Sequence, residues 1–437
     1  MPFYFVVSNK ICTFAAKSKY MEKELFRTII AENQEYIGRI PLVQRPLDLE
    51  EYGNYVFVGV RQAGKSYLLY QRIQQLLANG VDIENIVYVN FDDERLQGMS
   101  VTDFDLILQA YHSMYDSQPI FFFDEIQNVE GWANFARRLA NQKYRIYITG
   151  SNAKMLSRDI ETVLGGRYLD ISVFPYSFSE YLKAVGVLVS KNWQYGRKAN
   201  ELQRHFRTYF DWGGFPELVH FQEKRIWLNS LYNRIFFNDL VVRHKIKNED
   251  ALRLCVRRLA ESVKQPCSLN RLSNLIKATG TPCSPSTVME YVRYLQESCL
   301  LISIDNYVSK FVEKETIKKH YFVDNGLLHL FINNPNTSLL ENLCTITLYK
   351  KYGKGLYYYN RNIEVDFYVP DEGLAVQASY QMSDEETIER EVKALVALHG
   401  LYPLKRAMII TYEDEGEIVR EGLKIEIKPA WKWVMEG

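Results

Sequence analysis

Apolar runs alternate with amphipathic stretches between positions 55 and 150 of the chain. Apolar, β-branched and aromatic residues fill the runs 55–58, 86–90, 119–124 and 144–150, and stretches with helical spacing separate them. Continuous apolar strands separated by helices are typical of a parallel sheet that helices cover on both faces. Such sheets bind ligands at the carboxyl ends of their strands. The pattern therefore predicts an α/β domain with a site at that edge.

The pattern of apolar positions changes in the second half of the chain. Residues 175–250 have a mostly helical pattern, with an interruption at 212–216. Residues 251–330 show three helices followed by two strands, which is the order of a winged-helix domain. From about position 340 the pattern is α+β. The elements expected in these last two regions are helices at 251–263, 269–278 and 285–298 and strands at 300–304, 320–323, 356–360, 363–369, 374–379, 405–412 and 423–428.

A capping box, Ser383-x-x-Glu386, marks the expected start of a helix in the C-terminal region. The apolar positions that follow at helical spacing should face the core. They are Ile388, Val392, Leu395 and Val396.

Composition and charge exclude several classes of protein. The 53 basic residues balance the 53 acidic ones, so net charge indicates neither a nucleic-acid nor a membrane partner. No apolar run approaches the roughly 18 residues of a membrane span. The cysteines form no CxxC pair and have no nearby histidine at zinc-ligand spacing, which indicates reduced thiols and a cytoplasmic location. They are Cys12, Cys255, Cys267, Cys283, Cys299 and Cys344.

The segment from Gly59 to Ser66 fits the P-loop pattern GxxxxGK(S/T), and a predicted strand and helix flank it as the pattern requires. Backbone N–H groups of such a loop surround phosphates, the lysine reaches the β/γ-phosphates, and the serine hydroxyl can bind Mg²⁺. The alternative is a chance match in a glycine turn. The residues predicted to contact ATP here are Gly59, Arg61, Gln62, Ala63, Gly64, Lys65, Ser66 and Tyr67.

An acidic pair, Asp124-Glu125, ends the third predicted strand. ATP hydrolysis needs an acid that holds Mg²⁺ and a group that orients the attacking water. We expect Asp124, together with Ser66, to bind the metal and Glu125 to polarise the water. The alternative is an acidic pair that only caps the strand.

Three further residues are candidates for the same site. Asn152 follows the next strand and can contact the γ-phosphate, or it is an ordinary turn residue. Arg167 can act as an arginine finger, or it forms a surface or interdomain ion pair. Pro216, in Gly214-Phe-Pro216, can place a rigid turn against the adenine, or it belongs to an ordinary helix-to-helix turn.

These motifs in combination resemble the AAA-type ATPases of bacteria and archaea in which a winged helix and a restriction-nuclease-like domain of unknown function follow the ATPase core. The resemblance runs from about position 25 to the end. It implies ATP binding at Lys65 and Ser66, metal and water handling at Asp124 and Glu125, a phosphate sensor at Asn152, and nucleotide contact by Pro216. The segments that carry the resemblance are 59–66, 123–127, 148–152, 164–167, 174–178 and 213–216.

The predicted fold class is α/β, with a P-loop NTPase core of parallel strands, then a helical and winged-helix segment, and then an α+β domain like restriction endonucleases. A length of 437 residues agrees with roughly three domains. The predicted division is an N-terminal extension at 1–24, the AAA-type core at 25–180, a helical lid at 181–250, the winged helix at 251–330 and the nuclease-like domain at 331–437.

The nuclease-like domain lacks part of its expected chemistry. Restriction-type nucleases bind metal with an Asp on one strand and with the acid of an acid-x-Lys triplet on the next. Glu364 and Asp366 stand on one face of the first strand. The triplet, however, reads Gln377-Ala-Ser379, so it supplies neither a carboxylate nor a lysine. Glu341 cannot replace both, and we expect the domain to be inactive.

We expect an Mg²⁺-dependent ATPase that acts as a switch, with an unknown protein as partner. A nucleic-acid partner has weak support. The third helix expected in the winged-helix region has a single basic residue, Arg293, and two acidic ones, Glu290 and Glu297, whereas helices that read bases usually carry basic or amide side chains. The alternative is a regulatory or nucleic-acid-associated module that binds ATP with negligible turnover.

Overall fold

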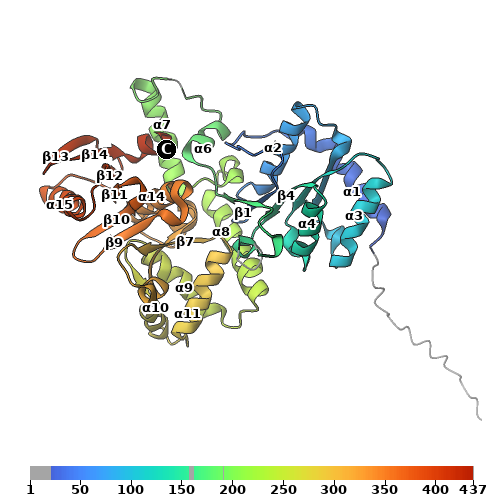
Figure 1. Cartoon of the computed structure of the whole chain (residues 1–437). Coiled ribbons are helices and arrows are strands. Elements are labelled where there is room, and N and C mark those ends of the chain that lie inside the picture. Colours follow the sequence, from blue (N-terminus) through green and yellow to red (C-terminus); the bar gives the residue numbers. More distant parts are fainter. Residues whose placement is uncertain (1–20, 157–161, 190, 437) are drawn as a thin grey trace, which may run out of the picture.

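A computed structural model describes residues 21–156, 162–189 and 191–436. Cys12 and most of the predicted N-terminal extension therefore lie outside the described residues. Two β-sheets organise these residues, and Figure 1 shows them at opposite ends of the molecule with helices α9 to α11 below. The first sheet has five strands and the second has nine.

The five-stranded sheet is entirely parallel, with the strand order β2-β3-β4-β1-β5. Four of its strands confirm the predicted apolar runs. The fifth, β5, was not predicted, because at this edge of the sheet its side chains are mostly exposed and its polar residues interrupt the apolar run. The strands are β1 (Tyr55–Gly59), β2 (Ile86–Asn90), β3 (Ile120–Asp124), β4 (Arg145–Gly150) and β5 (Leu169–Val173).

Helices cover both faces of this sheet. Alternation along β3 sends Phe121 and Phe123 into the core under one set of helices, and Ile120 and Phe122 into the core on the other face. Burying one such phenylalanine side chain contributes about 1.5–3 kcal/mol. The first face carries α1 (Lys23–Tyr36), α3 (Phe104–His112) and α4 (Trp132–Asn141), and the second carries α2 (Lys65–Ala78).

A helical segment follows the parallel sheet, as the pattern of residues 175–250 predicts. The interruption expected at 212–216 lies at Gly213, where φ is +77°. A Cβ atom at this position would lie 1.9 Å from Asp324 Oδ1, so only glycine fits. The helices are α6 (Phe178–Ala184), α7 (Gly196–Trp212), α8 (Lys224–Arg234) and the π-helix Ile235–Val242.

Three helices and a β-hairpin occupy the next segment at nearly the predicted positions. Asn248, Ser268 and Ser284 each cap one helix by accepting a hydrogen bond from a backbone N–H in its first turn. Assignment of this segment to the winged-helix fold stays a prediction. The elements are α9 (Glu249–Glu261), β6 (Cys267–Ser268), α10 (Leu269–Lys277), α11 (Pro285–Glu297), β7 (Leu301–Asn306), α12 (Phe311–Thr316) and β8 (Ile317–Phe322).

The hairpin and the C-terminal region share one nine-stranded sheet, in the order β13-β14-β12-β11-β10-β9-β7-β8-β6. Strands β7 and β9 join the two parts as a parallel pair. Asn306 Nδ2 donates to Asn360 O at 2.7 Å, and Asn360 N donates to Asn306 Oδ1 at 3.0 Å. The predicted boundary at 330 thus lies within a region that a single sheet spans. The remaining elements are α13 (Asn325–His329), α14 (Asn336–Tyr352), β9 (Tyr357–Asn360), β10 (Glu364–Val369), β11 (Leu374–Ala378), α15 (Glu385–Leu401), β12 (Arg406–Thr411), β13 (Gly416–Arg420), β14 (Leu423–Pro429) and α16 (Ala430–Glu436).

The predicted capping box of α15 is wrong by one residue. Asp384 is the N-cap, and its carboxylate accepts a hydrogen bond from Thr387 N at 2.7 Å. A carboxylate at this position also interacts favourably with the helix dipole, which favours Asp384 over its neighbour Ser383. Val392 and Leu395 are buried, as predicted, whereas Ile388 and Val396 are only partly buried.

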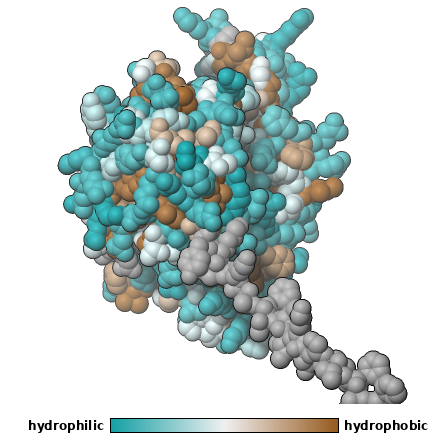
Figure 2. All heavy atoms as spheres, turned by 90° about the vertical axis from the view of Figure 1, so that its right-hand side faces the viewer, coloured by the Kyte–Doolittle hydropathy of each residue, from teal (hydrophilic) through white to brown (hydrophobic). Residues whose placement is uncertain are grey.

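Within the described ranges, no helix combines the length and the apolar character that crossing a bilayer requires. Figure 2 shows the face on the side of the parallel sheet, where apolar atoms form small separate groups among hydrophilic ones.

Candidate functional site

The P-loop connects the end of β1 to the start of α2. Gly59 is required at the strand end, because a Cβ atom there would lie 1.9 Å from the carbonyl oxygen of Val173 on β5. The chain then turns through Gln62 and Gly64, which have φ values of +62° and +93°. Helix α2 begins at Lys65, so the backbone N–H groups of its first turn are free to face a ligand.

Lys65 is the buried cation of the site, with 4% of its surface exposed. Its Nζ donates to the carbonyl oxygens of Gly59 at 3.2 Å and Val60 at 3.3 Å. The same nitrogen lies 3.3 Å from Glu125 Oε1. The P-loop lysine and the acidic pair of β3 therefore meet in one place.

Asp124 is fully enclosed at the end of β3. It accepts hydrogen bonds from Tyr88 at 2.7 Å, from Thr149 and from Ser66. Burial raises the pKa of the Asp124 carboxyl, and the charge of Glu125 adds to this, while the three hydroxyl donors oppose it. The contact between Ser66 and Asp124 brings together the two predicted metal ligands.

Glu125 adopts a left-handed backbone conformation, with φ of +52°, which is uncommon for this residue type. Its Oε2 accepts hydrogen bonds from Gln127 Nε2 at 2.5 Å and from Ser151 N at 3.2 Å. Burial alone would raise the pKa of Glu125, but the charge of Lys65 and these hydrogen bonds together lower it. The carboxylate is therefore ionised and held in one orientation.

Asn152 and Arg167 make only local hydrogen bonds among the residues that the structure describes. Asn152 lies directly after β4, and its Oδ1 accepts from Lys154 N at 2.9 Å. Arg167 is exposed and donates to the carbonyl oxygen of Gly165 at 3.0 Å. Both the functional and the structural interpretations of these two residues stay open.

Pro216 lies against the P-loop, since a Cβ atom at Gly64 would be 3.5 Å from Pro216 Cγ. Asp324, from the start of α13, holds the turn before it by accepting from Gly214 N at 2.8 Å. Tyr67, by contrast, is 53% exposed on α2.

Two ion pairs hold the P-loop from outside, and neither was predicted. Arg45 donates to the carbonyl oxygen of Ala63 at 3.0 Å and to Glu180 at 2.7 Å. Arg61 donates from two nitrogens to the two carboxylate oxygens of Asp239, each at 3.0 Å. Asp239 belongs to the π-helix, so this second pair ties the P-loop to the helical segment. The partners in each pair lie far apart in the sequence, so no motif of fixed spacing predicts that they pair.

A second charged cluster lies in the C-terminal sheet. Lys319, on β8, is completely buried, and its Nζ contacts Glu341 at 3.2 Å, Glu364 at 3.2 Å and Asp366 at 3.1 Å. Tyr321 donates to Glu341 at 2.7 Å. Burial, together with the charge of Asp366, raises the pKa of Glu341 to about 7. Lys319 was not predicted to belong to this cluster, because it lies on a strand well before the motif that contains Glu364 and Asp366.

The side chains at the degenerate triplet make structural contacts. Gln377 accepts from Asp366 N at 2.7 Å and donates to Glu391 Oε2 at 2.8 Å. Ser379 donates to the carbonyl oxygen of Gln381 at 3.1 Å. Across the described ranges, no group of three or more His, Cys, Asp or Glu side chains is arranged to hold a metal ion.

We predict that Lys319→Met destabilises the fold by about 3–5 kcal/mol, because it leaves the buried carboxylate of Glu341 without its cation. The loss should be greater at pH 8 than at pH 6, since Glu341, with a pKa raised to about 7, is more fully ionised at pH 8. Urea unfolding at both pH values measures the change. Lys318→Met is the matched control, since the partly exposed ammonium of Lys318 pairs with Asp305 and with no other carboxylate among the described residues. Equal effects of the two substitutions would contradict the prediction.

We predict that Asp324 makes stability depend on pH. Burial raises its pKa to about 6, above the roughly 3.9 of an unfolded aspartate. The stability that this raised pKa contributes is full below about pH 4 and is lost as pH rises through 6. Between pH 4 and pH 7, the free energy of unfolding of the wild type should fall by about 2–3 kcal/mol relative to Asp324→Asn. A difference that stays constant with pH would refute this.

Comparison with known proteins shows that two parts of the chain match models of protein families. Residues 52–182 match the family model described as "AAA domain", and residues 203–338 match a domain of unknown function, DUF8612. The Walker-type ATPase paby2304 of Pyrococcus abyssi has a solved structure that is 12% identical, with a match that covers 72% of this chain and 97% of that one. Its TM-score of 0.38 is too low to carry an argument.

Two curated relatives match nearly the whole chain. An uncharacterized protein of Haemophilus influenzae is 31% identical over 391 residues, which are 86% of this chain and 93% of that protein. Uncharacterized protein MJ1544 of Methanocaldococcus jannaschii is 31% identical over 432 residues, which are 94% of this chain and 95% of that protein. This chain carries an AAA domain and belongs to the same family as MJ1544.

Proposed function

We propose that this protein binds ATP at the P-loop, hydrolyses it to ADP and phosphate, and uses the nucleotide state as a switch. The observation that carries the proposal is the contact between Lys65 and Glu125 at the carboxyl edge of the parallel sheet. ATP hydrolysis needs a lysine on the phosphates and a group that orients the attacking water in the same site.

The donor set fits Mg²⁺. Ser66 Oγ and the Asp124 carboxylate supply the hard oxygen atoms that this ion prefers, and they already contact each other. A bound Mg²⁺ would neutralise charge on the β- and γ-phosphates. Asp124 keeps Ser66 oriented, and Tyr88 and Thr149 keep Asp124 in place.

The proposed role of Glu125 is to orient water. Its lowered pKa keeps it ionised at neutral pH, and Gln127 and Ser151 fix one of its oxygens. The other oxygen faces Lys65. When the phosphates of ATP attract the lysine, that oxygen becomes available to accept a proton from water. Asn152 as phosphate sensor and Arg167 as arginine finger remain part of the proposal.

The proposed switch passes through the P-loop to the rest of the chain. Arg61 connects the loop to the π-helix through Asp239, which also accepts a hydrogen bond from Arg243 at 3.0 Å. One residue further, His244 stacks on Tyr294 of α11 with ring centroids 3.8 Å apart. A movement of the P-loop on ATP binding would thus reach the segment that contains α11.

We predict that Glu125→Gln retains ATP binding but slows steady-state phosphate release by about 10²-fold or more, because a positioned base contributes roughly that factor. Lys65→Ala should weaken ATP binding by about tenfold or more, since it removes charge-assisted hydrogen bonds. Glu130→Gln, an exposed carboxylate in the same domain, is the control and should match the wild type.

Three outcomes would contradict the proposal. Unchanged ATP affinity in Lys65→Ala would refute the P-loop assignment. Unchanged turnover in Glu125→Gln would place the base elsewhere. ATP binding by the wild type without phosphate release would favour the regulatory module over the hydrolysing switch.

We propose that the C-terminal cluster is structural and has no nuclease activity. The ammonium of Lys319 lies among the carboxylates where a metal ion would otherwise be needed, and Gln377 brings no negative charge. We therefore predict that single- and double-stranded DNA and RNA remain uncut in the presence of Mg²⁺ or Mn²⁺, with or without ATP. Cleavage that disappears in Asp366→Ala would show that the site is active.

A further inference from the structure

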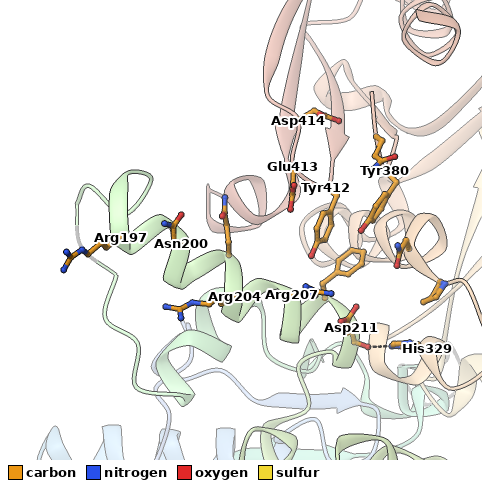
Figure 3. Close-up of a pocket in the computed structure, with 15 residues that line it drawn as sticks. Arg197, Asn200, Arg204, Arg207, Asp211, His329, Tyr380, Tyr412, Glu413 and Asp414 are labelled. Atoms are coloured by element: carbon orange, nitrogen blue, oxygen red, sulfur yellow. Dashed lines mark hydrogen bonds between the residues drawn. The ribbon is translucent and has the colours of Figure 1, made fainter. Parts of the chain in front are cut away.

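A groove of about 1110 Å³ lies between α7 and the loops that follow β11 and β12. Figure 3 shows arginines along α7 on one side and a pair of tyrosines with carboxylates on the other. None of the P-loop residues lines this groove. It is therefore separate from the proposed ATP site.

Three arginines form a stripe along one wall. Arg197, Arg204 and Arg207 are seven and three positions apart, a spacing that places them on one face of α7. All three are exposed, and among the residues that the structure describes none of them forms a salt bridge. Lys198, on the same helix, does pair with Glu201 at 2.9 Å. The stripe thus presents positive charge to the groove, and Asp211, one helical turn after Arg207, offsets part of it.

Two tyrosines form an aromatic surface on the opposite wall. The rings of Tyr380 and Tyr412 stack with centroids 4.9 Å apart and planes 19° from parallel. Phe210, from α7, supports Tyr412 edge-on at 5.0 Å. Both tyrosines are half-buried, so their position is fixed while part of each ring faces the groove.

Three carboxylates line the groove: Glu413 and Asp414 follow Tyr412 on its loop, and Asp211 lies on α7 beside Arg207. Asp414 accepts from Met382 N at 2.8 Å and so belongs to the fold of its loop. Glu413 is exposed on the same loop. Asp211 lies at the end of α7. Burial raises the pKa of its carboxyl, and the charges of His329 and Arg207 oppose this rise. Two of these three carboxylates therefore lie on the tyrosine wall, and Asp211 stands at the end of the arginine stripe.

We propose that this groove binds a segment of single-stranded nucleic acid. Guanidinium groups in a row suit consecutive phosphates, and exposed tyrosine rings suit unpaired bases. Carboxylates beyond the rings can accept hydrogen bonds from the amino groups of adenine, cytosine or guanine. An acidic peptide fits less well, because its side chains would meet Glu413 and Asp414.

The proposal goes beyond the switch function and does not depend on it. Binding is measured without nucleotide, and ATP affinity is measured separately on the same preparations. Failure of one proposal therefore leaves the other intact.

The test is fluorescence anisotropy with the full chain and labelled oligo(dA) and oligo(rA) of about 12 nucleotides, within the usual site sizes. We expect both to bind, with a slope of log affinity against log salt of about −2 for three phosphate contacts. Arg204→Glu should weaken binding by about tenfold or more. Arg137→Glu, an exposed arginine on α4, is the matched control and should leave affinity within about twofold.

The aromatic wall has its own pair of variants. Tyr412→Ala should weaken binding by about 5- to 150-fold, since one stacked base contributes roughly 1–3 kcal/mol. Tyr412→Phe keeps the ring and should bind like the wild type. ATP affinity of Tyr412→Ala shows whether the variant still folds, and Arg204→Glu tests the groove independently because Arg204 is exposed.

Three results would overturn the proposal. One is absence of oligonucleotide binding at low salt. Another is binding that Arg204→Glu and Arg137→Glu weaken equally. The third is binding of polyglutamate in preference to both oligonucleotides, which would assign the groove to an acidic protein segment. Tighter binding of oligo(dA) or of oligo(rA), by contrast, agrees with the proposal and shows whether the groove prefers DNA or RNA.

Discussion

A buried ammonium group determines the arrangement of the nucleotide site. Lys65 is enclosed at the end of β1, and an enclosed cation requires acceptors around it. Two carbonyl oxygens of the P-loop and the carboxylate of Glu125 provide them. Glu125 reaches this position from a left-handed backbone conformation that regular strand geometry would not give. The ammonium of Lys65 and the carboxylate of Glu125 thus stabilise each other at the centre of the site.

Other segments of the chain meet at the same loop. Arg45 and Arg61 attach it to Glu180 and to Asp239, and Pro216 lies against Gly64. The carboxyl-terminal part reaches the same region. Lys350 of α14, whose pKa burial lowers to about 8, donates to the carbonyl oxygen of Pro175 at 3.0 Å. This convergence gives the proposed switch a physical basis, because a displaced P-loop would disturb its contacts with Arg45, Asp239 and Pro216.

The sequence was most informative where local rules decide the structure. Buried strands and their order along the chain followed from continuous apolar runs, and the P-loop followed from glycines with a lysine at fixed spacing. Strand β5 was not predicted, because it lies at an exposed edge of the sheet and has no continuous apolar run. The start of α15 was misplaced because Ser383 and Asp384 are both good caps, and only the folded geometry selects one of them.

Long-range electrostatic partners could not be predicted in the same way. Asp239 looks like any acid in a helical stretch, and its pairing with Arg61 depends on how two distant segments pack. Lys319 lies 47 positions before Asp366, on a strand assigned to a different domain, so a motif search next to Asp366 could not find it. The pairing of Lys319 with Asp366 becomes visible only when β8 and β10 are seen to belong to one sheet.

The central claim is that ATP replaces Glu125 as the partner of Lys65. A crystal structure of the chain with Mg²⁺ and a non-hydrolysable ATP analogue tests it most directly. The account predicts that Lys65 Nζ contacts the β- and γ-phosphates and that the Glu125 carboxylate has left Lys65 and faces the γ-phosphate. Bound nucleotide with the pair between Lys65 and Glu125 still at the present 3.3 Å would contradict it.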